Sequence, residues 1–125
     1  MLNQRNAPVE VFIATAVGAA GALAFALMGL IQWQVEGDSE LIKFPVIVAA
    51  LGLLAAGGLV TGVRPARLTA AFVFGLVALV HLLAVLNDVP VWIRVASGVL
   101  SAAHVFAVVL LNTRPARLHF LGGQR

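Results

Sequence analysis

Four long apolar stretches occupy most of this 125-residue chain, at residues 11–31, 44–63, 68–86 and 90–111. A bilayer core about 30 Å thick needs about 20 helical residues to cross it, so each stretch is long enough to be a transmembrane helix. Hydrophobic residues make up 62% of the chain and charged residues 10%, which leaves too little polar sequence for a soluble domain. The sequence therefore predicts an all-α polytopic membrane protein. Its single domain, residues 1–125, is a four-transmembrane-helix bundle with a short basic C-terminal tail at 112–125.

The first stretch is predicted to be a retained helix rather than a cleaved signal peptide. Arg5 before the stretch and the small residues Ala24 and Ala26 within it are features that a signal peptide would share. However, residues 11–31 form an uncharged run of 21 residues, whereas the apolar region of a signal peptide spans about 7–15 residues.

The distribution of basic residues predicts the orientation of the bundle, because positively charged flanks of membrane spans stay cytoplasmic. With four spans, both termini share one side. That side carries Arg5, Arg64, Arg67, Arg114, Arg117 and Arg125, and the other carries Lys43 and Arg94. We therefore expect an N-in, C-in topology with both termini cytoplasmic. The preference for arginine over lysine, with abundant Ala, Val and Gly, is typical of a high-GC genome and favours a bacterial plasma membrane.

Composition argues against several functional classes. The chain has no cysteine, which excludes disulfides, thiolate metal sites and thiol catalysis. The net charge is only +3, and the arginines flank the spans, so we expect them to contact lipid headgroups rather than nucleic acid. No group of nucleophiles, acids or metal ligands forms a recognisable catalytic pattern. We predict a protein that is not an enzyme, with no catalytic residues, no metal site and no cofactor.

The connections between spans carry interfacial anchors. The outer connections are expected at residues 32–40 and 87–90, with Trp33 and Trp92 at the headgroup level. The inner connection, residues 61–68, contains a glycine that ends one helix and a proline that starts the next, which predicts a tight helical hairpin. Arg64, Arg67, Arg114 and Arg117 are the predicted basic anchors on the inner side.

A pentapeptide, Arg-Pro-Ala-Arg-Leu, occurs twice, at residues 64–68 and 114–118. Each copy follows a span that runs from the outside to the inside. The repeat indicates either a duplicated two-helix unit or the same boundary chemistry arising twice, and the sequence leaves both open. After the second copy, His119, Phe120 and Leu121 are expected to lie along the inner interface, followed by a frayed tail.

Small residues recur at the spacing that lets helices pack closely in a membrane. The predicted packing stripes are Ala14, Gly18, Ala22 and Ala26 on the first span, Gly58 and Gly62 on the second, and Gly98 and Ala102 on the fourth. We expect them to pack within one bundle; a partner protein or a second copy of the chain is the alternative.

His81 and His104 are the candidate polar sites inside the membrane, where ionisable groups are costly and usually functional. Counting inward from the outer loop they share, His104 lies deeper than His81 by about 6–12 Å at 1.5 Å per residue. Two axial ligands of one haem need similar depths, so this offset argues against a shared haem. We expect neutral histidines hydrogen-bonded to neighbouring helices, with a proton relay or substrate contact as the alternative.

Glu10 precedes the first span and is expected to form an interfacial pair with Arg5, Arg64 or Arg67. In length and helix number the chain resembles small multidrug transporters, but their mechanism needs a glutamate well inside the first helix, and Glu10 lies outside the apolar run. Residues 57–81, with a basic turn and a histidine near the end of the third span, resemble part of the DoxX-type four-helix membrane proteins. This resemblance covers less than a quarter of the chain and implies no function.

Three functional hypotheses follow. The first is a non-enzymatic accessory or assembly subunit of a membrane complex, supported by the small-residue stripes and the nearly nonpolar interior. The second is an oligomeric small-solute or proton-coupled transporter, in which several copies line a polar path and His81, His104 and Glu10 are the candidate lining residues. The third is a haem-bearing redox anchor whose ligands are supplied between chains or by a partner protein. The partners expected are the lipid bilayer and a membrane protein or a second copy of the chain.

Overall fold

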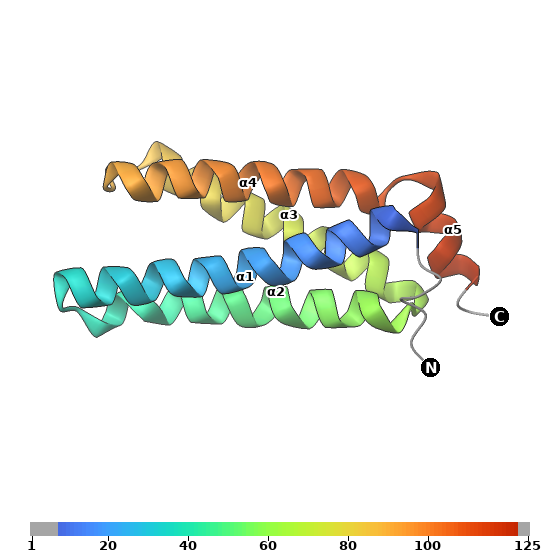
Figure 1. Ribbon diagram of the computed structural model, residues 1–125, viewed down its shortest axis with the longest axis horizontal. Helices are drawn as coiled ribbons and strands as arrows, with labels where there is room; N and C mark the ends of the chain where they lie inside the picture. Colours follow the sequence, from blue (N-terminus) through green and yellow to red (C-terminus); the bar gives the residue numbers. More distant parts are fainter. Residues whose placement is uncertain (1–7, 123–125) are drawn as a thin grey trace.

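The computed structural model describes residues 8–122, and all of its regular elements are helices (Figure 1). They are α1 (Val9–Glu36), the short 3₁₀ helix η2 (Ser39–Ile42), α2 (Lys43–Thr61), α3 (Arg64–Leu86), α4 (Val91–Leu111) and α5 (Arg114–Gly122). Four of these segments, Val9–Glu36, Ser39–Thr61, Arg64–Leu86 and Val91–Leu111, are long and apolar enough to cross a membrane. The predicted four apolar helices are therefore confirmed.

The connection between the first two spans is shorter than the sequence suggested. α1 continues to Glu36, so the expectation of a connection over residues 32–36 was wrong. Polar residues there end the apolar run, but none of them breaks a helix. The helix stops at Gly37, whose φ of 73° is left-handed and whose N–H donates to the Trp33 carbonyl at 2.7 Å. Asp38 then caps η2 by accepting from the Glu40 N–H at 3.0 Å.

The connection between α2 and α3 is the predicted tight turn. Gly62 ends α2 in the left-handed region at φ 75°, and Pro65 lies in the first turn of α3. From this turn, however, the two helices diverge: α2 packs chiefly on α1, and α3 chiefly on α4. Figure 1 shows the two pairs meeting near the chain termini and spreading apart toward the opposite end.

The end near the termini is closed by a packed core. Its fully buried large side chains are Val11, Leu59, Phe74, Leu111 and Phe120. Phe120 comes from α5, so part of the predicted C-terminal tail is a helix that packs against this end of the bundle. Ala116 of the same helix is also fully buried. Residues 123–125 of that tail lie outside the described part of the chain.

Most of the predicted small-residue stripes pack inside the bundle. Ala14, Gly18 and Ala22 are buried, and a Cβ added to Gly52 would lie 3.2 Å from the Cβ of Ala22, so α1 and α2 approach closely there. The prediction for α4 was wrong at Ala102, which is exposed, whereas Gly98 is half-buried and a Cβ added there would lie 3.8 Å from Val85. Exposed apolar side chains cover the outside of the helices, which suits a lipid environment.

Candidate functional site

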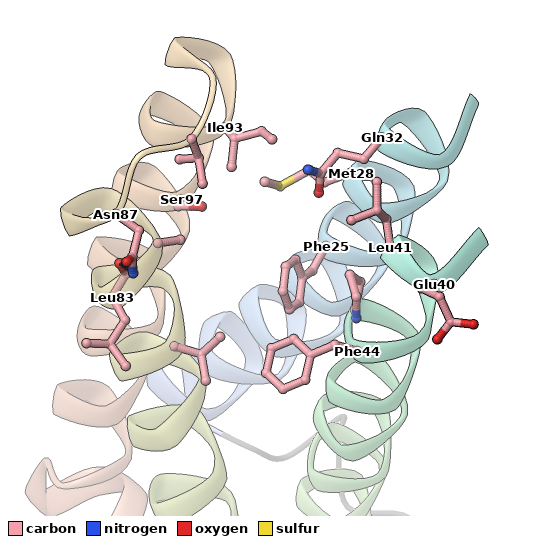
Figure 2. A pocket seen from close by; sticks show the side chains of 14 residues that line it. Phe25, Met28, Gln32, Glu40, Leu41, Phe44, Leu83, Asn87, Ile93 and Ser97 are labelled. Carbon is pink, nitrogen blue, oxygen red and sulfur yellow. Dashed lines mark hydrogen bonds between the residues drawn. The ribbon is translucent and has the colours of Figure 1, made fainter. Parts of the chain in front are cut away.

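The divergence of the two helix pairs leaves a cavity of about 430 Å³ at the end of the bundle away from the termini. One wall comes from α1, η2 and α2, and the other from α3 and α4 (Figure 2). Its lining residues are Phe25, Met28, Gln32, Glu40, Leu41, Phe44, Pro45, Val80, Leu83, Ala84, Asn87, Val89, Ile93 and Ser97. The volume falls in the range of about 300–1,000 Å³ that is usual for small-molecule sites.

Aromatic packing builds one wall of the cavity. Phe25 of α1 and Phe44 of α2 meet edge to face, with ring centroids 6.3 Å apart. One helical turn further along α1, Gly29 lies against Pro45 of α2, and a Cβ added at Gly29 would lie 2.8 Å from the Pro45 ring. The two helices therefore approach closely at this point. This wall is therefore tightly packed.

Ser97 supplies a buried polar group on the facing wall. Its side chain is only 1% exposed, yet its Oγ has no hydrogen-bond partner. In Figure 2 it extends from α4 toward the wall formed by α1. A buried hydroxyl without a partner lowers the stability of a protein by about 1–3 kcal/mol. A molecule that enters the cavity and hydrogen-bonds to Ser97 Oγ would remove this cost.

Three polar residues, Gln32, Glu40 and Asn87, also line the cavity. Figure 2 shows Gln32 pointing toward the opposite wall, whereas the carboxylate of Glu40 points away from the cavity. Glu40 is exposed and pairs with Lys43 at 2.7 Å, while the Asn87 carbonyl accepts from Arg94 Nη2 at 3.0 Å. The cavity thus combines apolar walls with hydrogen-bonding groups.

His81 and His104 lie against each other, with ring centroids 5.8 Å apart. The two imidazole rings therefore lie at more similar depths than the sequence predicted, and the expected depth offset was wrong. α3 and α4 run in opposite directions, and side chains lean toward the N-terminus of their helix. His81 and His104 consequently lean toward each other. The depth argument against a haem shared by His81 and His104 of one chain therefore fails. The haem-bearing anchor with ligands from other chains stays a prediction.

The hydrogen bonding of the two histidines also differs from expectation. His104 Nδ1 lies 2.7 Å from the Leu100 carbonyl of its own helix, not a neighbouring one. Neither ring nitrogen of His81 has a partner, although the residue is fully buried. Its ring instead packs edge to face on Phe25, with centroids 4.5 Å apart. Because Phe25 also lines the cavity, one aromatic ring contacts both the cavity and the imidazole.

The predicted interfacial anchors lie at the two ends of the bundle. Trp33, near the end of α1, is half-buried, and Trp92, in the first turn of α4, is 41% exposed. Arg64 and Arg67 are in the first turn of α3, and Arg114 and Arg117 are in α5.

The expected ion pair of Glu10 with Arg64 or Arg67 does not form. Within residues 8–122, the Lys43–Glu40 pair is the sole salt bridge. The remaining candidate partner, Arg5, lies outside the described residues, as does Arg125.

No protein-family model, curated protein or solved structure matches the chain, so only its own geometry bears on its function. In the part of the chain that the structure describes, no three His, Asp or Glu side chains gather where they could hold a metal ion. The arrangement suits binding of a small molecule.

The sequence analysis did not predict the cavity or the buried position of Ser97 on its wall. A signal was present: Ser97, Ser101 and His104 recur at the spacing of one face of a helix. Ser101 donates to the Ala78 carbonyl at 2.9 Å and His104 packs on His81, so this polar face points into the bundle. The cavity itself depends on the divergence of α2 and α3, which no local pattern encodes.

Proposed function

We propose that this protein is a non-enzymatic membrane protein that binds a small amphipathic molecule between its two helix pairs. The observation that carries the proposal is the unpartnered hydroxyl of Ser97 on the wall of a cavity of about 430 Å³. Apolar walls with a few placed polar groups are typical of small-molecule sites. Here Met28, Phe44 and Leu83 would contact an apolar body, and Ser97 would bond a hydroxyl or carbonyl on it.

The closed end of the bundle favours binding over passage. Phe74, Leu111 and Phe120 are buried at the end near the termini, beyond the cavity. A ligand that enters from the open end would meet this packed core. Conduction through one chain would require the core to separate, so the transporter hypothesis needs additional copies.

The test uses purified full-length protein and a decanol that carries a photoreactive diazirine as the probe. We expect crosslinks on the peptides that line the cavity, and saturable labelling. Ala84→Phe should remove most of the labelling, because the added ring fills the cavity that Ala84 lines. Ala102→Phe adds the same ring at an exposed position outside the cavity lining, so it should label like the wild type.

Ser97→Ala separates the role of the hydroxyl from the shape of the cavity. It should weaken probe binding about five-fold, the value of one hydrogen bond. It should also raise the stability of the unliganded protein, because the unpartnered Oγ is removed. Ser101→Ala is the matched control, since that hydroxyl is already bonded to Ala78. Equal labelling of all four variants and the wild type would refute the binding site.

We also propose the finer topology that the basic residues favour: both termini cytoplasmic, in a bacterial plasma membrane. Support comes from the basic residues at the helix ends: Arg64, Arg67, Arg114 and Arg117 lie at the end of the bundle near the termini, whereas Lys43 and Arg94 lie at the opposite end. The chain has no cysteine, so single cysteines at Gly37 and Thr113 can be labelled without background. In intact cells, an impermeant maleimide should label position 37 and not 113. The reverse pattern would contradict the orientation.

The accessory-subunit hypothesis stays a prediction beside the binding site. A subunit and a stand-alone bundle could each carry the same ligand. Pull-down from native membranes in mild detergent distinguishes them, because a subunit elutes with a stoichiometric partner and a stand-alone bundle elutes without one.

A further inference from the structure

The two copies of Arg-Pro-Ala-Arg-Leu meet at one place in the fold. Arg64, Arg67 and Leu68 of the first copy and Arg117 of the second line a cavity of about 170 Å³. Phe120 and Leu121 complete its lining. A motif repeated 50 residues apart in the sequence thus forms a single basic pocket at the end of the bundle near the termini.

The pocket is held in place by the packing of α5. Ala116 and Phe120 are buried in the core, which fixes α5 against the beginning of α3. Arg67 Nη1 donates to the Leu111 carbonyl at 3.4 Å and to Asn112 Oδ1 at 3.2 Å. These contacts hold one edge of the Arg67 guanidinium against the end of α4. Arginine has five N–H donors, so others remain for a ligand.

The charge in the pocket is uncompensated within the described residues. No acidic side chain lines it, and none of its three arginines forms a salt bridge there. The first turn of α3, which carries Arg64 and Arg67, adds the positive end of a 23-residue helix. Guanidinium groups bind phosphate oxygens in a bidentate manner, and basic pockets between membrane helices are typical sites for anionic headgroups.

We propose that this pocket binds a phosphate group, with Arg64, Arg67 and Arg117 as its ligands. Two sources share this chemistry: the headgroup of an anionic phospholipid and a free phosphate. The apolar side chains of Leu68 and Leu121, both exposed, line the same pocket and would contact the glycerol and first methylenes of a lipid. The site is separate from the cavity at the other end of the bundle, and it does not depend on the function proposed for that cavity.

The test measures lipid retention by full-length protein in mild detergent, using native mass spectrometry. The protein is exposed in parallel to cardiolipin, phosphatidylglycerol, zwitterionic phosphatidylcholine and inorganic phosphate. Retention of an anionic lipid over phosphatidylcholine supports the site with a lipid as its source. Binding of inorganic phosphate that displaces the anionic lipids supports the site with free phosphate as its source. Equal retention of all lipids together with no phosphate binding would overturn the proposal.

The repeat supplies a matched control. Arg117→Gln should weaken binding about ten-fold, as expected for loss of a charge-assisted hydrogen bond. Arg114→Gln removes the same charge from the same helix, at an exposed position that does not line the pocket, and should leave binding unchanged. Arg117→Lys keeps the charge without the guanidinium and should fall between the two. If Arg114→Gln and Arg117→Gln weaken binding equally, the effect is general surface charge and the pocket is not a site. Because both residues are exposed, the thermal midpoints of the variants should match that of the wild type.

Discussion

The close contact of Gly18 with Phe74 allows a sharp test of how the closed end is packed. A Cβ added to Gly18 would lie 2.7 Å from Phe74 Cε1 and 3.3 Å from Cε2. Phe74 is fully buried and also packs edge to face on His104, so its ring has no open space to enter. Gly18→Ala should therefore overpack the core.

The magnitude follows from two opposing terms. Overpacking a well-filled core costs about 1–3 kcal/mol, while replacing a helical glycine by alanine gains about 0.5–1 kcal/mol. Gly57→Ala isolates the second term, because a Cβ at Gly57 meets no atom within 4 Å. The gain is common to both variants, so Gly18→Ala should be less stable than Gly57→Ala by about 1–3 kcal/mol.

The assay is reversible unfolding of each variant in mixed micelles, followed by circular dichroism. A third variant, Gly18→Ala with Phe74→Leu, replaces the ring that the new Cβ would meet. The double variant should be more stable than the sum of the two single changes predicts, by about 1 kcal/mol or more. If Gly18→Ala is as stable as Gly57→Ala, the packing described for α1 on α3 is refuted.

Three further predictions concern turns, interhelical bonds and pH. Gly62→Ala should destabilise the protein by about 1–2 kcal/mol in the same assay, because φ at this position is 75°. Ser101→Ala should cost about 0.5–1.5 kcal/mol through loss of its bond to the Ala78 carbonyl. Burial lowers the pKa of His119 from 6.5, so the unfolded chain takes up the proton first as the pH falls. The contribution of His119 to the free energy of unfolding should therefore be fully present above pH 6.5 and should decline below it. In melting curves recorded over a pH series, His119→Gln should reduce this decline.

The sequence predicted the elements well because each depends on local composition. Gly62 and Pro65 predicted the turn between α2 and α3. Uncharged runs predicted the spans, because the thickness of the bilayer sets the length of a transmembrane helix. The error at Gln32–Glu36 arose because the end of an apolar run marks the membrane boundary, whereas Gly37 marks the end of the helix. Helix α5 was missed because a short basic segment has no apolar run, although its burial rests on two residues, Ala116 and Phe120.

The candidate site was harder to predict because it depends on angles between helices. His81 and His104 were found as intramembrane polar residues, but their contact needed the opposite lean of side chains on antiparallel helices. The basic pocket similarly needed α5 to pack against the beginning of α3. The sequence identified the repeated pentapeptide, yet the convergence of its two copies follows from tertiary packing alone.

The two ends of this bundle differ in how they satisfy their polar groups, and the difference supports a binding role for the open end. At the closed end, Arg67 bonds to the carbonyl of Leu111 and to Asn112. Toward the open end, Ser97 Oγ and both nitrogens of His81 are buried without partners. Each such group costs about 1–3 kcal/mol, and alanine at position 97 would remove one of these costs without leaving a large void. We therefore propose that the hydroxyl of Ser97 serves binding, because a ligand in the cavity would complete its hydrogen bonding.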